Sequence, residues 1–184
     1  MSLEKISDKL NILKDDGACK HLLNKLIPDI SLYNQDNILL KLKRKDTFRI
    51  IFYCYPMTGN PNKKLPKNWN NIPGARGCTS ENISFRNSYE ELIKLNSVPV
   101  GISTQTVAEI KEMTIRLNIT HDILSDINLR FTNSLKLPIF KIKNQVFIKR
   151  LTLVVENSII KKIFYPIFSP DIHFKDVVEW LKKN

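Results

Sequence analysis

A cysteine followed by helix-initiating residues is the position in this chain best suited to nucleophilic chemistry. Cys78 follows Gly77 and precedes Thr79, Ser80 and Glu81, after which apolar residues recur at helical spacing. Thr79 or Ser80 can cap such a helix, and Glu81 favours its first turn. The thiol would then lie at the positive end of the helix dipole, among unpaired backbone N–H groups. We therefore expect a depressed pKa for the Cys78 thiol and a partly ionised, nucleophilic sulfur.

The residues before Cys78 favour an accessible sulfur. Arg76 adds a cation two residues away, and Gly74 and Gly77 allow a sharp backbone bend through which solvent could reach the thiol. The alternative is that Cys78 is a small buried hydrophobic residue, the usual role of an intracellular cysteine. The polar and glycine neighbours argue against this alternative, although the local chemistry leaves both open.

The composition is typical of a single globular domain. The chain has 184 residues, of which 42% are hydrophobic and 26% charged. No apolar run is long enough to span a bilayer, and Met1 to Leu13 lack the apolar segment of a signal peptide, so we expect a cytoplasmic protein without membrane association. Cys19, Cys54 and Cys78 form no C-x-x-C pair, and the histidines are scattered. We therefore expect no disulfide framework and no metal site.

The net charge of +11 admits two interpretations. A basic chain can bind nucleic acid or an anionic surface, and a nucleic-acid-binding module is a rival function that rests on this charge alone. The lysines, however, are dispersed in ones and twos, and the aromatic residues fall in apolar runs instead of between basic residues. This pattern favours a solvated lysine-rich surface, and we expect no specific nucleic-acid partner.

A central strand and a long loop must deliver the chain to Cys78. Residues 48–55 form a nearly continuous hydrophobic run, which predicts a strand buried on both faces. Pro56 ends this strand, and the connection 57–77 is rich in Asn, Pro, Gly and Lys. Loops of this length are usually functional or disordered. Apolar residues that include Trp69 predict an ordered flap beside Cys78, with Trp69 as its anchor.

The remaining pattern alternates between strands and helices. We predict helical segments at 18–26, with Asp16 as N-cap, and at 79–96, 106–117, 129–135 and 173–183, and strands at 30–33, 38–42, 98–103, 122–126, 146–156 and 159–165. The turn at Asn157-Ser158 should close a hairpin. This order predicts an α/β fold, a three-layer sandwich with mixed pairing. Sites in such sheets lie beyond the carboxyl ends of parallel strands, where the strand ending at Cys54 leads.

Four stretches together resemble the peroxiredoxins, in the redoxin branch of the thioredoxin-fold superfamily, and within them the bacterioferritin-comigratory-protein-like group. The stretches are residues 52–56, 77–87, the strand pair 100–103 and 123–126, and 149–155. The resemblance runs from about Leu26 to the end of the chain. It implies a thioredoxin-like three-layer α/β/α sandwich with a mixed central sheet over 26–184. The pattern of the residues before it separately predicts a helical extension over 1–25, with an amphipathic helix before Asp15.

The resemblance also implies a function, that of a thiol-dependent peroxidase acting on hydrogen peroxide or organic hydroperoxides in cell redox homeostasis. Cys78 would be the peroxidatic cysteine and would cycle through a sulfenic acid. Arg150 would stabilise the thiolate and the developing charge, Pro56 would shape the loop, and Thr152 would support it from a neighbouring strand. An external thiol or redoxin would be the reductant, with no cofactor, and a homodimer is expected by analogy.

The sequence departs from the family pattern at the hydroxyl that orients peroxide. Relatives have a loop of Pro, three residues, Thr or Ser, two residues and then the cysteine. Here Asn71 and Ala75 occupy the proline and hydroxyl positions, and 59–72 is an insertion. Thr58 or Thr79 could substitute for the missing hydroxyl. The same departure supports an alternative function, a catalytically weak redoxin that senses peroxide or binds a partner.

A second departure concerns the resolving cysteine. Many relatives carry it five residues after the peroxidatic cysteine, where this chain has Ile83. Cys54 is a candidate for this role if its Cα atom lies near that of Cys78; the alternative is a buried strand residue. Without a resolving thiol, the mechanism uses one cysteine. A disulfide reductase of the thioredoxin type is disfavoured because C-x-x-C is absent.

Overall fold

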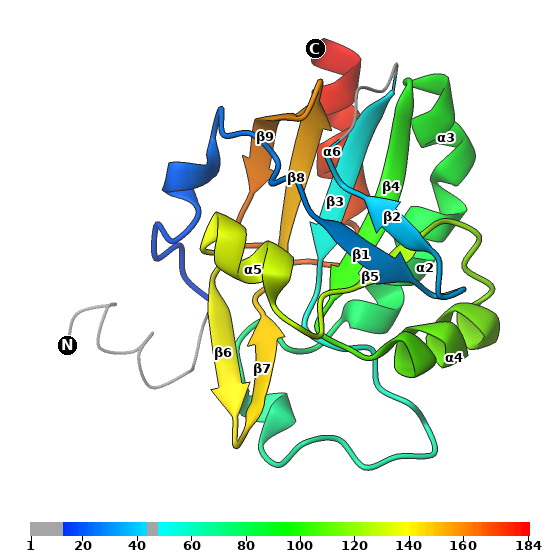
Figure 1. Cartoon of the computed structure of the whole chain (residues 1–184), viewed down its shortest axis with the longest axis vertical. Coiled ribbons are helices and arrows are strands. Elements are labelled where there is room, and N and C mark those ends of the chain that lie inside the picture. Colours follow the sequence, from blue (N-terminus) through cyan, green and yellow to red (C-terminus); the bar gives the residue numbers. More distant parts are fainter. Residues whose placement is uncertain (1–12, 44–47) are drawn as a thin grey trace.

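The described part of the N-terminal region packs against the sheet and forms a shorter helical turn than expected. The computed structural model describes residues 13–43 and 48–184 (Figure 1). Most of the helix expected before Asp15 lies outside these residues. The prediction of a helix over 18–26 is wrong. Only a single 3₁₀ turn forms there, η1 (Lys20–Leu22), and Asp16 does not cap it. Cys19 and Leu22 are buried in the core, so tertiary packing sets this segment's conformation.

A seven-stranded mixed sheet forms the centre of the molecule (Figure 1). Its order is β2-β1-β5-β4-β3-β8-β9, with β3, β4 and β5 parallel and the other pairs antiparallel. The strands are β1 (Ser31–Asn34), β2 (Leu39–Lys41), β3 (Arg49–Cys54), β4 (Ser97–Ser103), β5 (Ile123–Ser125), β8 (Leu151–Glu156) and β9 (Ile159–Phe164). The mixed sheet and the hairpin at Asn157-Ser158 confirm the predicted architecture.

Helices cover both faces of this sheet and complete the thioredoxin-like sandwich. One face carries α2 (Cys78–Asn87), α3 (Tyr89–Lys94), α4 (Val107–Leu117) and α6 (His173–Lys183), and the other carries η1 and α5 (Arg130–Leu135). The single helix expected over 79–96 is interrupted at Ser88. Within the described ranges, no helix is long and apolar enough to cross a membrane.

A small second sheet lies beside the first and carries the long loop. It pairs β6 (Ile139–Ile142) with β7 (Gln145–Ile148), so the strand expected over 146–156 is divided where the chain leaves β7 for β8. Trp69, in the 3₁₀ turn η2 (Trp69–Asn71), packs on this hairpin, with ring centroids 5.9 Å from Phe140 and 5.1 Å from Phe147. Trp69 is therefore the predicted anchor of the loop.

The alternation of β3 divides the core into two parts. Tyr53 and Tyr55 point to the face that contains Cys78, whereas Phe52 and Cys54 point to the face covered by α5. All of these strand residues are almost fully buried. β3 is therefore the buried central strand that the sequence predicts, and it contributes side chains to two separate cores.

Candidate active site

Cys78 is the first residue of α2, which begins one residue before the predicted start, and no side chain caps this helix. The N-cap is Gly77, with φ of 96°, and a Cβ there would lie 2.3 Å from Cγ of Pro170. Only glycine suits this left-handed and crowded position. The prediction that Thr79 or Ser80 caps the helix is therefore wrong. The Ser80 hydroxyl instead donates to the Gly77 carbonyl at 3.0 Å. The unpaired N–H groups of the first turn lie beside the thiol.

The guanidinium of Arg150 lies directly against the sulfur. Its Nη2 is 3.1 Å from Sγ of Cys78 and donates at 2.9 Å to the carbonyl of Arg76. Arg150 immediately precedes β8, and the turn from β7 into β8 aims its side chain at the start of α2. Both side chains are buried, with 3% exposure each. The fold thus joins two predicted site residues that are 72 positions apart.

Glu81 completes this arrangement, although its place in the sequence indicated only a favourable charge in the first helical turn. Its carboxylate is fully buried and forms an ion pair with Nη1 of Arg150. Burial raises the pKa of Glu81 to about 7, against the lowering effect of Arg150. Burial lowers the pKa of Arg150, but the charges of Glu81 and Cys78 raise it by more than burial lowers it. The guanidinium therefore stays charged. The sequence feature that could have predicted this contact is an acidic residue three positions after Cys78, one helical turn along.

The prediction of a depressed pKa for Cys78 is wrong. Burial raises the pKa of Cys78 above its ordinary value, although Arg150 and the backbone N–H of Met57 both lower it and Glu81 raises it. The sulfur is enclosed, so desolvation outweighs the local dipole. The side chain of Arg76 does not assist, because its guanidinium donates to Asn70 at 2.6 Å.

Two buried hydroxyls adjoin each other, and one of them, that of Tyr55, lies near the sulfur. Thr58 and Tyr55 are buried, and neither side-chain oxygen has a hydrogen-bond partner of ordinary geometry among the described residues. The pKa of Tyr55 is raised by burial and by the charge of Cys78, while the hydroxyls of Ser103 and Thr58 lower it, so these groups are neighbours. Thr79 is half-buried on the first turn of α2.

The other predicted site residues support the loop and the neighbouring helix. Pro56 is buried directly after β3, where the chain enters the long loop. The hydroxyl of Thr152 lies 3.0 Å from Nε2 of His173, the first residue of α6, so its contact is with this helix instead of with the loop. The segment before α6 includes Pro170, which packs on Gly77. Thr152 therefore acts on the site only indirectly.

The sheet separates Cys78 from the other cysteines. Cys19 and Cys54 belong to the core on the opposite face, and all three cysteines are free thiols. A bridge from Cys54 would have to pass through the strand that carries it, so its candidacy as resolving thiol has no support in the geometry. Among the described residues, no cluster of three acidic, histidine or cysteine side chains could hold a metal ion.

Comparison with known proteins identifies one family. The Redoxin family model matches residues 23–181. The chain is 25% identical over 159 residues to chloroplastic peroxiredoxin Q of Arabidopsis thaliana, covering 84% of this chain and 64% of that one. It is 24% identical to a putative peroxiredoxin bcp of Helicobacter pylori, covering 86% of this chain and 97% of that one. The chain thus spans less than two thirds of the plant relative's length.

Solved structures share the fold. The crystal structure of peroxidoxin BcpB from Mycobacterium tuberculosis superposes with a TM-score of 0.72 at 20% identity, covering 88% of this chain and 96% of that one. Peroxiredoxin Q from Xanthomonas campestris gives a TM-score of 0.69 at 16% identity, with 89% and 98% coverage. These similarities confirm the thioredoxin-like sandwich.

Proposed function

The chain belongs to the redoxin family, and from this premise we propose that it is a thiol-dependent peroxidase with Cys78 as its nucleophile. The relatives named peroxiredoxin Q and bcp support peroxidase activity in general. One observation carries the assignment to Cys78, namely the contact of 3.1 Å between its sulfur and Nη2 of Arg150 at the start of a helix. A buried guanidinium in contact with a buried sulfur stabilises the negative charge that forms when the sulfur becomes a thiolate.

In the first half-reaction, the thiolate of Cys78 attacks one oxygen of the hydroperoxide. The S–O bond forms as the O–O bond breaks, Cys78 becomes a sulfenic acid, and the departing oxygen takes a proton to leave as water or an alcohol. Negative charge moves from sulfur to the leaving oxygen. Arg150 and the N–H of Met57 stabilise this charge, while the pair with Glu81 holds the guanidinium in place.

We propose that Thr58 and Tyr55 supply the hydroxyl that Ala75 lacks. Both hydroxyls are buried and adjoin each other, and the hydroxyl of Tyr55 lies close enough to the sulfur for the charge of Cys78 to raise its pKa, so a bound peroxide could hydrogen-bond to this pair. The position of Thr58 is fixed, because its backbone N–H donates to the Gln105 side chain at 2.8 Å and its carbonyl accepts from the same side chain at 3.2 Å. Thr79 is the weaker of the two earlier candidates because its side chain is less buried.

Reduction would require a thiol from outside the chain. Because the sheet lies between Cys78 and the other two cysteines, the one-cysteine scheme is favoured. A second candidate function, a slow peroxide sensor, is favoured by one observation, the enclosed sulfur with its raised pKa. Only a small fraction of such a thiol is ionised at neutral pH, which limits turnover.

The decisive experiment is anaerobic titration of the reduced protein with hydrogen peroxide, followed by intact mass and peptide mapping. We expect the gain of one oxygen per chain, located on Cys78, and its reversal by added thiol. A loss of two hydrogens would indicate a disulfide and exclude the one-cysteine scheme, and oxidation elsewhere would exclude Cys78. Steady-state peroxide consumption with a thiol donor then separates an enzyme, which turns over many times, from a sensor.

A further inference from the structure

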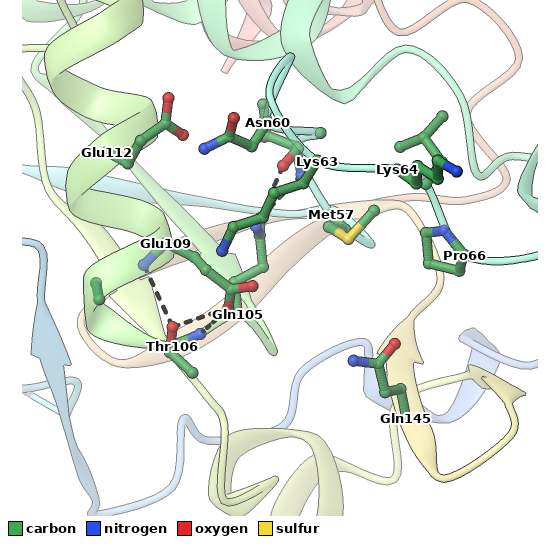
Figure 2. A pocket seen from close by; sticks show the side chains of 14 residues that line it. Met57, Asn60, Lys63, Lys64, Pro66, Gln105, Thr106, Glu109, Glu112 and Gln145 are labelled. Carbon is green, nitrogen blue, oxygen red and sulfur yellow. Dashed lines mark hydrogen bonds between the residues drawn. The ribbon is translucent and has the colours of Figure 1, made fainter.

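A large cavity adjoins the candidate site and is built largely by the insertion. Its volume is about 610 Å³, and it lies between the loop after β3 and the first turns of α4, with β7 at its edge (Figure 2). The cavity is far larger than hydrogen peroxide requires and falls within the range of about 300–1,000 Å³ typical of small-molecule sites. Arg116 ties α4 to this loop, donating at 3.1 Å to the carbonyl of Gly59.

The inner end of the cavity reaches the neighbourhood of the sulfur. Met57 and Thr58 both line it. The backbone N–H of Met57 also lowers the pKa of the Cys78 thiol, and the buried Thr58 hydroxyl adjoins that of Tyr55. Met57 therefore belongs both to the cavity wall and to the surroundings of the Cys78 thiol.

The two carboxylates that line the cavity are engaged by other groups, whereas its two ammonium groups pair with no described carboxylate. Glu109 is occupied by the capping box of α4, and Glu112 pairs with Arg116 at 2.6 Å. Lys63 and Lys64 also line the cavity, and no described carboxylate pairs with either ammonium group. Figure 2 shows the Lys63 side chain extending across the cavity toward the start of α4, with Gln145 facing it from β7. Apolar surface from Met57, Leu65 and Pro66 completes the wall. This lining suits a small molecule that carries carboxylate groups.

We propose that this cavity binds the reductant, a small thiol bearing carboxylate groups, and that Lys63 and Lys64 recognise those groups. This inference rests on the proposed function. It is supported by the lack of another cysteine on this face of the sheet, by the cavity wall that Met57 shares with the surroundings of Cys78, and by two lysines that pair with no carboxylate among the described residues.

The chemistry balances with two equivalents of the thiol. The first attacks the sulfenic acid of Cys78, an S–S bond forms, the S–O bond breaks, and the thiol proton leaves with the hydroxyl as water. The second attacks this mixed disulfide and releases the thiol of Cys78 together with the symmetrical disulfide. No other oxidant or reductant is needed.

The test measures reduction apart from oxidation. The protein is oxidised with one equivalent of peroxide, and the decay of the sulfenic acid is followed with glutathione, which carries two carboxylates, or with the uncharged 2-mercaptoethanol. In Lys63→Ala/Lys64→Ala we expect reduction by glutathione to slow about three- to tenfold, with 2-mercaptoethanol unaffected. Lys67→Ala is the matched control, an exposed lysine of the same loop outside the cavity lining, and should match the wild type.

A direct binding measurement keeps the inference separate from the proposed function. S-methylglutathione, which cannot react, should shift the backbone amide NMR signals of Met57 and Gln105 in the reduced wild type, and the double variant should bind it several-fold more weakly. Equal reduction rates or equal binding in the two proteins would overturn the cavity assignment while leaving the peroxidase proposal intact. If Cys78 resists peroxide, the peroxidase proposal fails, and binding alone decides whether the cavity takes such a ligand.

Discussion

Cys78 and Cys54 are both fully enclosed cysteines, yet the molecule surrounds them differently. Cys54, on β3, lies in an aliphatic and aromatic core, and burial raises its pKa well above the ordinary value. Cys78 loses water as well, but it gains the guanidinium of Arg150, the N–H of Met57 and a helix start. The comparison teaches that burial alone does not make a cysteine structural. Specific groups that compensate for lost solvation distinguish a reactive thiol from an inert one.

The largest effect that would test this contrast is removal of each sulfur in turn. Cys78→Ser should abolish peroxide consumption, a loss of roughly a thousandfold or more, because the nucleophile is gone. Cys54→Ala should keep the wild-type rate within about twofold and lose only modest stability from the small cavity left behind. Stopped-flow peroxide kinetics and thermal unfolding measure both. Equal losses in the two variants would remove the contrast.

The second test removes the cation beside one cysteine. Arg150→Met should slow the peroxide reaction by about 10²- to 10³-fold, because the charge that develops on sulfur and oxygen loses its stabilising partner. Arg76→Met is the control, since that guanidinium binds Asn70 instead of the sulfur. Ultraviolet thiolate titration should show a higher Cys78 pKa in the first variant alone. An unchanged titration in Arg150→Met would exclude the arginine from the site.

The pH dependence follows from the direction of the Cys78 shift. Since its pKa is raised above the ordinary value of 9.0, the thiolate fraction and the oxidation rate should rise about tenfold per pH unit between pH 6 and 8. The folded chain holds this proton more tightly than the unfolded chain, so stability is retained below about pH 9 and falls as pH rises through the folded pKa. Cys78→Ser should lack that decline. A rate independent of pH above 6 would show that Arg150 outweighs burial.

Removing the buried hydroxyl of Thr58 or of Tyr55 should have a smaller effect on the rate of peroxide attack. Thr58→Val and Tyr55→Phe each remove one hydrogen-bonding group and keep the shape of the side chain. Each should slow peroxide attack about three- to tenfold while leaving alkylation of Cys78 by iodoacetamide unchanged. The difference between the two reagents isolates peroxide orientation from thiol reactivity. If both reactions slow equally, these hydroxyls act on the thiol and not on the peroxide.

The smallest effect sharpens the electrostatic part of the comparison. Glu81→Gln removes the negative charge that raises the Cys78 pKa and keeps an oxygen that accepts from Nη1 of Arg150. The thiolate titration should move to lower pH, and the peroxide rate at pH 7 should increase a few-fold. Glu91→Gln, on the exposed surface of α3, serves as control. A titration that moves upward would mean that Glu81 acts mainly by positioning Arg150.

Most of the fold was predictable because its signals are local. Continuous hydrophobicity identified β3, the turn at Asn157-Ser158 identified the β8–β9 hairpin, and helical spacing identified α4 and α6. The failures occur where tertiary contacts override these patterns. The single turn η1 replaces a longer helix because Cys19 and Leu22 pack against the sheet, and the strand expected over 146–156 divides because β7 pairs with β6.

The sequence alone determined that Cys78 begins a helix, because glycine before it and helical spacing after it are properties of neighbouring residues. Only the tertiary structure decided that the sulfur is enclosed, that Arg150 reaches it from 72 positions away, and that Glu81 binds the same guanidinium. It also decided that Cys54 faces the other core. Desolvation and charge pairing depend on distances in space, and those distances arise only when strands distant in the chain align.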